Sequence, residues 1–135
     1  MSFVGLIYKD LICLAKRRLL SSKGEKVPFG GYWSIFGGAI EKGESPFFAA
    51  HRELIEETKI DIPIDRLKYC KTYRNESETM HIYFAEFKAI PTINLDFEHT
   101  EYGWFKLDSI EASPEPIDPN IKDAVKKYQK NRFIL

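Results

Sequence analysis

The residues best suited to chemistry are three glutamates, Glu53, Glu56 and Glu57, which follow Arg52 in the chain. On a helix, positions separated by three and four residues share a face, so these three carboxylates would project close together. Carboxylates this close repel one another unless a cation lies between them, and carboxylate oxygens are ligands that Mg²⁺ and Mn²⁺ prefer. Arg52 could hold one of them by a bidentate contact. The same spacing is also typical of a solvated acidic helix face.

Glycine is concentrated immediately before this acidic segment. Six of the eight glycines in the chain fall within one central stretch: Gly24, Gly30, Gly31, Gly37, Gly38 and Gly43. Glycine is favoured where the backbone turns sharply or approaches another group closely. A glycine-rich loop that leads into an acidic helix favours a cation site over a solvated helix face.

The segment from Gly38 to Ile60 resembles the Nudix box, G-x5-E-x7-R-E-U-x-E-E-x-G-U, in which U is a bulky aliphatic residue. Eight of its nine specified positions match, and Lys59 stands where the family has its last glycine. The matching residues are Gly38, Glu44, Arg52, Glu53, Leu54, Glu56, Glu57 and Ile60. The preceding residues 32–38 are similar to the family's usual approach to the box, with Phe36 where many members have proline.

The resemblance implies an α/β (α+β) protein with the Nudix fold, a mixed β-sheet sandwich flanked by helices. The box would form a loop, a helix and a second loop that together bind Mg²⁺, with Mn²⁺ as a substitute. Glu56 and Glu57 are similar to the family's metal ligands, and Glu53 to a ligand or to the base that prepares water. Gly37 or Gly38 would add a carbonyl ligand. Arg52 and Glu44 would organise the loop and helix.

The family often supplies one more glutamate from a loop outside the box. Glu98 is the first choice for this role and Glu101 the second, with an exposed acidic loop as the alternative. We interpret His99 as a loop or substrate-side residue and not as a ligand, because Mg²⁺ is poorly matched to imidazole.

Substrate contacts are sought among aromatic and basic residues near these segments. Tyr32, Tyr73 and Tyr83 could stack a nucleotide base, although aromatic residues more often belong to the core or its rim. Arg74 could contact phosphates, or could simply be a solvated surface residue.

The implied function is Mg²⁺-dependent hydrolysis of a phosphoanhydride bond in a nucleoside diphosphate linked to another moiety, such as a sugar. The alternative substrates are a damaged nucleoside triphosphate and the 5′ end of an RNA. A module that binds a nucleotide without catalysis is a further alternative. Such a module has no chemical need for three clustered glutamates, so their presence favours catalysis.

Composition limits the partners. The 135 residues are expected to form one Nudix domain over 1–135, and twenty basic residues balance twenty acidic ones. A neutral chain has no global field to hold DNA, so a small nucleotide is the expected partner. Cys13 and Cys70 lie in apolar runs and are predicted to be reduced core thiols, which favours the cytoplasm. No apolar run is long enough to span a membrane, and a homodimer is compatible with the sequence.

The elements expected to position the site follow from periodicity and turn residues. A strand hairpin, Ser2–Tyr8 and Leu11–Lys16, opens the chain. A helix over Pro46–Thr58 is capped by Ser45, because Ser accepts hydrogen bonds from free backbone donors and Pro suits the first helical position. The remaining predicted strands are Trp33–Phe36, Leu67–Tyr73, Thr79–Ile90 and Tyr102–Leu107, with a loop over Ile93–Thr100. A last helix starts at Pro119, with Asp118 as its cap and Ile121, Ala124, Val125 and Tyr128 on one face.

Overall fold

The computed structural model describes residues 1–132, which form seven strands and two α-helices. The strands are β1 (Ser2–Tyr8), β2 (Leu11–Arg17), β3 (Trp33–Ser34), β4 (Phe36–Gly38), β5 (Lys68–Arg74), β6 (Thr79–Phe87) and β7 (His99–Lys106). The helices are α1 (Pro46–Thr58) and α2 (Pro119–Arg132), and short 3-10 turns occupy Ile64–Arg66 and Leu107–Ser109. A mixed sheet with flanking helices confirms the predicted fold class.

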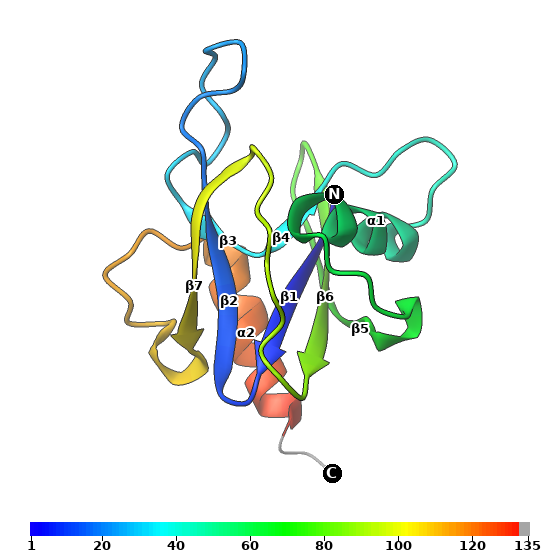
Figure 1. Cartoon of the computed structure of the whole chain (residues 1–135), viewed down its shortest axis with the longest axis vertical. Coiled ribbons are helices and arrows are strands. Elements are labelled where there is room, and N and C mark those ends of the chain that lie inside the picture. The colour runs from blue at the N-terminus through cyan, green and yellow to red at the C-terminus, as the bar shows by residue number, and fades with distance from the viewer. Residues whose placement is uncertain (133–135) are drawn as a thin grey trace.

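The strands form one mixed sheet in the order β3-β2-β1-β6-β5, with β1 and β6 parallel (Figure 1). The predicted hairpin of β1 and β2 is confirmed, but the two strands pair only near their turn, where Leu6 lies opposite Cys13. Farther from the turn, β4 pairs with β1 and β3 pairs with β2. The prediction of a single strand over Trp33–Phe36 is therefore wrong, because its two halves join different partners.

Alternating side chains of the sheet form two apolar layers. On β1, Val4 and Leu6 belong to the layer that contains Leu54 of α1. Phe3 and Ile7 belong to the layer that contains Ile121 of α2. The two helices thus cover opposite faces, and α2 lies behind the strands in Figure 1.

The two helices begin where the sequence predicts. The Ser45 hydroxyl accepts a hydrogen bond from the backbone N–H of Phe48 at 3.2 Å, so α1 is capped as expected. The Asp118 carboxylate accepts one from the N–H of Asn120 at 2.9 Å. Ile121, Ala124 and Val125 of α2 are buried, as their spacing predicts. Within residues 1–132, neither helix has the length and apolar character that crossing a membrane requires.

The segment between β6 and β7 differs most from expectation. β6 ends at Phe87 and not at Ile90, and β7 begins at His99 inside the predicted loop. β7 extends this far because its pairing with β2 continues past an irregularity at Lys16 and Arg17, where Arg17 lies opposite His99. The connecting segment crosses the front of the sheet in Figure 1. Its Ile93 is buried in the same layer as α1, so it returns close to that helix.

The two cysteines are buried free thiols, as predicted. Burial raises the pKa of Cys13 to about 12, so this thiol stays protonated and unreactive at neutral pH. Neither cysteine belongs to the acidic site.

Candidate functional site

The three glutamates of α1 lie at different depths. Glu57 is 1% exposed, whereas the side chain of Glu53 is 12% exposed and that of Glu56 is 55% exposed. Glu57 therefore faces the protein interior, Glu53 lies at the boundary and Glu56 reaches solvent. The predicted acidic face is a graded series that leads from solvent into the protein.

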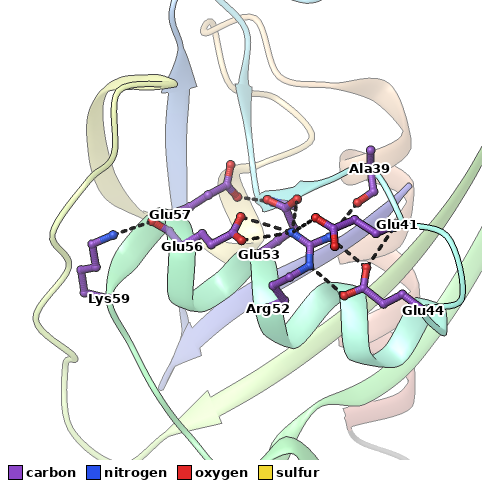
Figure 2. Close-up of polar contacts among 9 residues, drawn as sticks. Ala39, Glu41, Glu44, Arg52, Glu53, Glu56, Glu57 and Lys59 are labelled. Atoms are coloured by element: carbon purple, nitrogen blue, oxygen red, sulfur yellow. Dashed lines mark hydrogen bonds and ion pairs between the residues drawn. The ribbon is translucent and has the colours of Figure 1, made fainter.

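Arg52 organises the outer part of this series (Figure 2). Its Nε and Nη2 donate to the two carboxylate oxygens of Glu44 at 2.7 and 2.9 Å, so the two-nitrogen contact is with Glu44 and not, as predicted, with one of the three helix glutamates. Its Nη1 donates to Glu53 at 3.1 Å and to Glu56 at 3.2 Å. Nη2 also donates to the carbonyl of Ala39 at 2.9 Å, which fixes the loop before α1. Arg52 lowers the pKa of Glu44 to about 2, so this ion pair persists at any physiological pH.

Two glycines allow the strand before the box to approach the helix closely. The N–H of Gly37 donates to Glu57 Oε1 at 2.6 Å. A Cβ atom at Gly37 would lie 2.2 Å from the backbone oxygen of Ser2, too close for any side chain, and one at Gly38 would lie 2.6 Å from Glu53 Oε1 and displace this carboxylate. Glycine at these two positions therefore allows the backbone of β4 and the carboxylates of α1 to share one site.

The end of α1 has the left-handed conformation of a glycine position, although the residue is Lys59. Lys59 has φ 63° and ψ 19°, and its N–H donates to the carbonyl of Ile55 at 2.9 Å. Its ammonium donates to the carbonyl of Glu56 at 3.0 Å, which partly offsets the strain of this conformation. Lys59, which replaces the last glycine of the box, thus still ends the helix in the left-handed conformation expected for that glycine.

The loop before β7 is joined to both α1 and β2. The N–H groups of Asn94 and Asp96 donate to the carbonyls of Thr58 and Glu57 at 3.0 and 3.2 Å. On the other side, Arg18 donates from Nε to the carbonyl of Phe97 at 2.7 Å and from its backbone to that of Glu98 at 2.9 Å. These contacts hold the acidic loop against the glutamates of α1.

Glu98, the first choice for the extra glutamate, is close enough to Glu57 to influence its titration. Burial is the main cause that raises the pKa of Glu57 to about 10, and the neighbouring Glu98, Glu53 and Asp96 raise it further. Glu101, the second choice, is an exposed residue of β7 opposite Lys16. The structure therefore brings Glu98, and not Glu101, to the helix glutamates.

Glu57 has the properties of a metal ligand without its metal. Among the described residues, its Oε2 is one of two buried side-chain polar atoms that lack a hydrogen-bond partner, the other being Ser2 Oγ. An ionised carboxylate without a partner in the interior is costly, which is why burial raises the pKa of Glu57 and keeps this carboxyl protonated in the absence of metal. A divalent cation would satisfy Oε2 and offset the repulsion from Glu53 and Glu98, so these residues fit such a group.

Two residues beside Glu57 were not assigned to the site from the sequence. Asp96 and His99 each offer a ligand atom within 4.8 Å of one from Glu57. His99 is 6% exposed, and burial lowers its pKa even though Asp96 partly opposes the shift. Asp96 lies two residues before Glu98, so the density of acidic residues in this loop was a usable signal. The loop position predicted for His99 is wrong, because it is the first residue of β7.

The residues suggested for substrate binding are dispersed. Tyr83 is buried against Phe47, and the hydroxyl of Tyr73 donates to Asp123 of α2 at 2.5 Å, on the opposite face of the sheet from α1. Arg74 is exposed at the end of β5, and Tyr32 is partly exposed beside Phe29. Among the contacts of the described residues, none links these four side chains to the glutamates of α1.

The family model for the NUDIX domain matches residues 2–128. The chain belongs to the Nudix hydrolase family, as the box predicted. The match extends well beyond the box, over all seven strands and most of α2.

Individual relatives agree with this assignment. The oxidized purine nucleoside triphosphate hydrolase of Danio rerio is 30% identical over 130 residues, which cover 92% of this chain and 80% of that protein. A 40-residue stretch is 50% identical to an octanoyltransferase of Myxococcus xanthus, but it covers 30% of this chain and only 11% of that protein. The crystal structure of a MutT protein from Methanosarcina mazei Go1 shares the fold, with a TM-score of 0.77, 18% identity and coverage of 98% of this chain and 93% of that chain.

Proposed function

We propose that the chain hydrolyses a phosphoanhydride bond of a nucleotide with the help of Mg²⁺, for which Mn²⁺ can substitute. The observation that carries the proposal is the buried, unpartnered Oε2 of Glu57 among other carboxylates. A surface acidic face would have no reason to bury such a group. The residues that would hold the cation are Glu53, Glu56, Glu57 and Glu98, together with a carbonyl of Gly37 or Gly38.

The chain's own residues divide the work of hydrolysis. A bound divalent cation supplies neutralisation of the phosphoryl oxygens and a water of lowered pKa. Glu53 is placed to take the proton from the attacking water, because burial raises its pKa and makes it a better base than an exposed carboxylate. Arg52 orients Glu53 through the contact at Nη1 and holds the loop through Glu44. The oxygen of water joins phosphorus as the bridging P–O bond breaks.

The substrate we infer first is a nucleoside diphosphate linked to another moiety. The relative from Danio rerio is named for hydrolysis of oxidized purine nucleoside triphosphates, which favours a purine nucleoside triphosphate as the second candidate. The two reactions leave different products. A conjugate gives a phosphate monoester that only a phosphatase converts to phosphate, whereas a triphosphate cleaved between its α and β phosphorus atoms gives pyrophosphate.

A panel of nucleotides with Mg²⁺ tests the proposal. Phosphate is measured alone, after added phosphatase and after added inorganic pyrophosphatase, so that each class of product is recognised. Hydrolysis in ¹⁸O-labelled water identifies the phosphorus that is attacked. Glu56→Gln and Glu57→Gln are each expected to lower turnover at least about 100-fold, because a metal ligand is lost. Near-normal turnover in both variants, with circular dichroism showing a native fold, would contradict the assigned site.

A further inference from the structure

Three side chains that can bind metal lie together at the buried end of the acidic series. Glu57 belongs to α1, Asp96 to the loop before β7 and His99 to the start of β7, and one ligand atom of each lies within 4.8 Å of the others. Donors about 2.1 Å from a tetrahedral cation are about 3.4 Å apart, so the most distant pair would have to draw together by at most about 1.4 Å. The three residues are therefore spaced almost as a ligand set.

The arrangement is held by a backbone contact, by an aromatic contact and by a contact between two of the ligand groups. The backbone N–H of Asp96 donates to the carbonyl of Glu57 at 3.2 Å. The His99 ring packs edge-to-face on Phe36, with ring centroids 5.4 Å apart, and its Nδ1 lies 3.1 Å from Asp96 Oδ1. These contacts orient the imidazole and the two carboxylates toward one region.

A second observation indicates that this region has a missing ligand. Glu57 is 1% exposed, and its Oε2 has no hydrogen-bond partner. Burial without a hydrogen-bond partner is unfavourable even for a neutral polar group, and more so for a charged one. A buried carboxylate oxygen without a donor, next to an imidazole and another carboxylate, is a site that a cation would complete.

The imidazole determines which cation is suited best. Carboxylates alone suit Mg²⁺ and Mn²⁺, whereas imidazole suits Zn²⁺ and the neighbouring metals iron, nickel and copper. We propose that Glu57, Asp96 and His99 form an inner site for a divalent transition metal, with Zn²⁺ as the representative occupant and Mn²⁺ as a spectroscopic probe. This site lies next to the outer carboxylates, and it rests on the proposed function for its role because it shares Glu57 with the hydrolytic centre.

Electron spin echo spectroscopy of bound Mn²⁺ tests the inner site without any substrate. The purified chain is freed of metal with a chelator and loaded with less than one equivalent of Mn²⁺. Nitrogen-14 modulation from a coordinated imidazole is expected in the wild type and is expected to disappear in His99→Gln. His51→Gln is the matched control, because the His51 ring nitrogen contacts the carbonyl of Ile62 and not the carboxylate cluster. Because Mn²⁺ can also replace Mg²⁺ at the outer carboxylates, the spectrum is recorded in excess Mg²⁺; Mn²⁺ that then binds the wild type without nitrogen modulation would overturn the proposal, even if His99→Gln fails to fold.

Calorimetric titration with Zn²⁺ and Mg²⁺ provides the second measurement. Asp96→Asn is expected to weaken Zn²⁺ binding at least about 10-fold, because it removes the charge of one donor. His99→Glu replaces nitrogen with oxygen, so the preference for Zn²⁺ over Mg²⁺ should fall at least about 10-fold. An unchanged Zn²⁺ preference in folded His99→Glu would also overturn the proposal. Nitrogen modulation in a chain that hydrolyses no nucleotide would support the inner site and refute the proposed function, so the two can fail separately.

Discussion

Glu57→Gln tests whether the buried carboxylate weakens the metal-free fold. The glutamine carbonyl can still accept from the N–H of Gly37, and its amide can donate to the neighbouring carboxylates. Because folding raises the pKa of Glu57 from 4.5 to about 10, the folded state keeps a proton that the unfolded chain releases above pH 4.5. Stability therefore falls as the pH rises from 4.5 toward 10. At pH 7, about 2.5 pH units above the ordinary pKa, the loss is about 3 kcal/mol, because each pH unit contributes about 1.4 kcal/mol.

In the absence of metal, Glu57→Gln should be up to about 3 kcal/mol more stable than the wild type at pH 7, and this advantage should vanish near pH 4. Urea unfolding in a chelator, followed by circular dichroism at both pH values, measures the difference. Divalent cation should reverse the order once it is present at about 1,000 times its Kd, since it then stabilises the wild type by about 4.1 kcal/mol. The reasoning is refuted if the variant is less stable than the wild type in chelator at pH 7, or if cation stabilises both proteins equally.

Three further predictions concern residues around Glu57. Arg52→Lys should lower turnover about 10- to 100-fold, because one ammonium cannot replace the planar guanidinium that joins Glu44 to the helix glutamates. Steady-state kinetics measure the change, with circular dichroism as the control for folding. Lys59→Gly should change the melting temperature by no more than a few degrees, because relief of left-handed strain is offset by greater freedom of the unfolded chain; a larger drop would show that the lysine contact dominates. Glu98→Gln should reduce turnover and raise the Mg²⁺ concentration needed for half activity, whereas Glu101→Gln should do neither; a Mg²⁺ titration of both variants decides.

The parts of the fold that could be predicted are the helices and strands whose bounds are marked by neighbouring residues in the sequence. Ser45 and Pro46 mark the start of α1, and the helix has the predicted bounds, Pro46–Thr58. The apolar runs of β1 and β2 have no residues typical of helix caps, and they form the expected hairpin. By contrast, Trp33–Phe36 divides between two partners because β1 and β2 separate away from their turn, and this divergence depends on the whole sheet.

The same distinction applies to the site. Helical spacing places Glu53, Glu56 and Glu57 on one side of α1. It does not indicate how deeply each side chain is buried. Depth depends on β4 and on the loop before β7, and the path of that loop has no periodic signal. His99 is buried because the pairing of β7 with β2 extends to Arg17, a tertiary effect that local sequence does not encode. Assigning Asp96 requires knowing that its backbone binds α1.

Local departures from ordinary protein structure are concentrated around Glu57. Glu57 is a buried acid with an unpartnered oxygen, Gly37 has no room for a Cβ atom and Lys59 is left-handed. Each is unfavourable or restrictive for folding alone, yet all lie in β4, in α1 or at the end of α1. The other left-handed non-glycine residues of the described chain, Lys9 and Phe29, lie in turns apart from these carboxylates. Because such departures persist where the surrounding structure or a ligand compensates for them, their coincidence at one acidic centre favours a cation as the missing component.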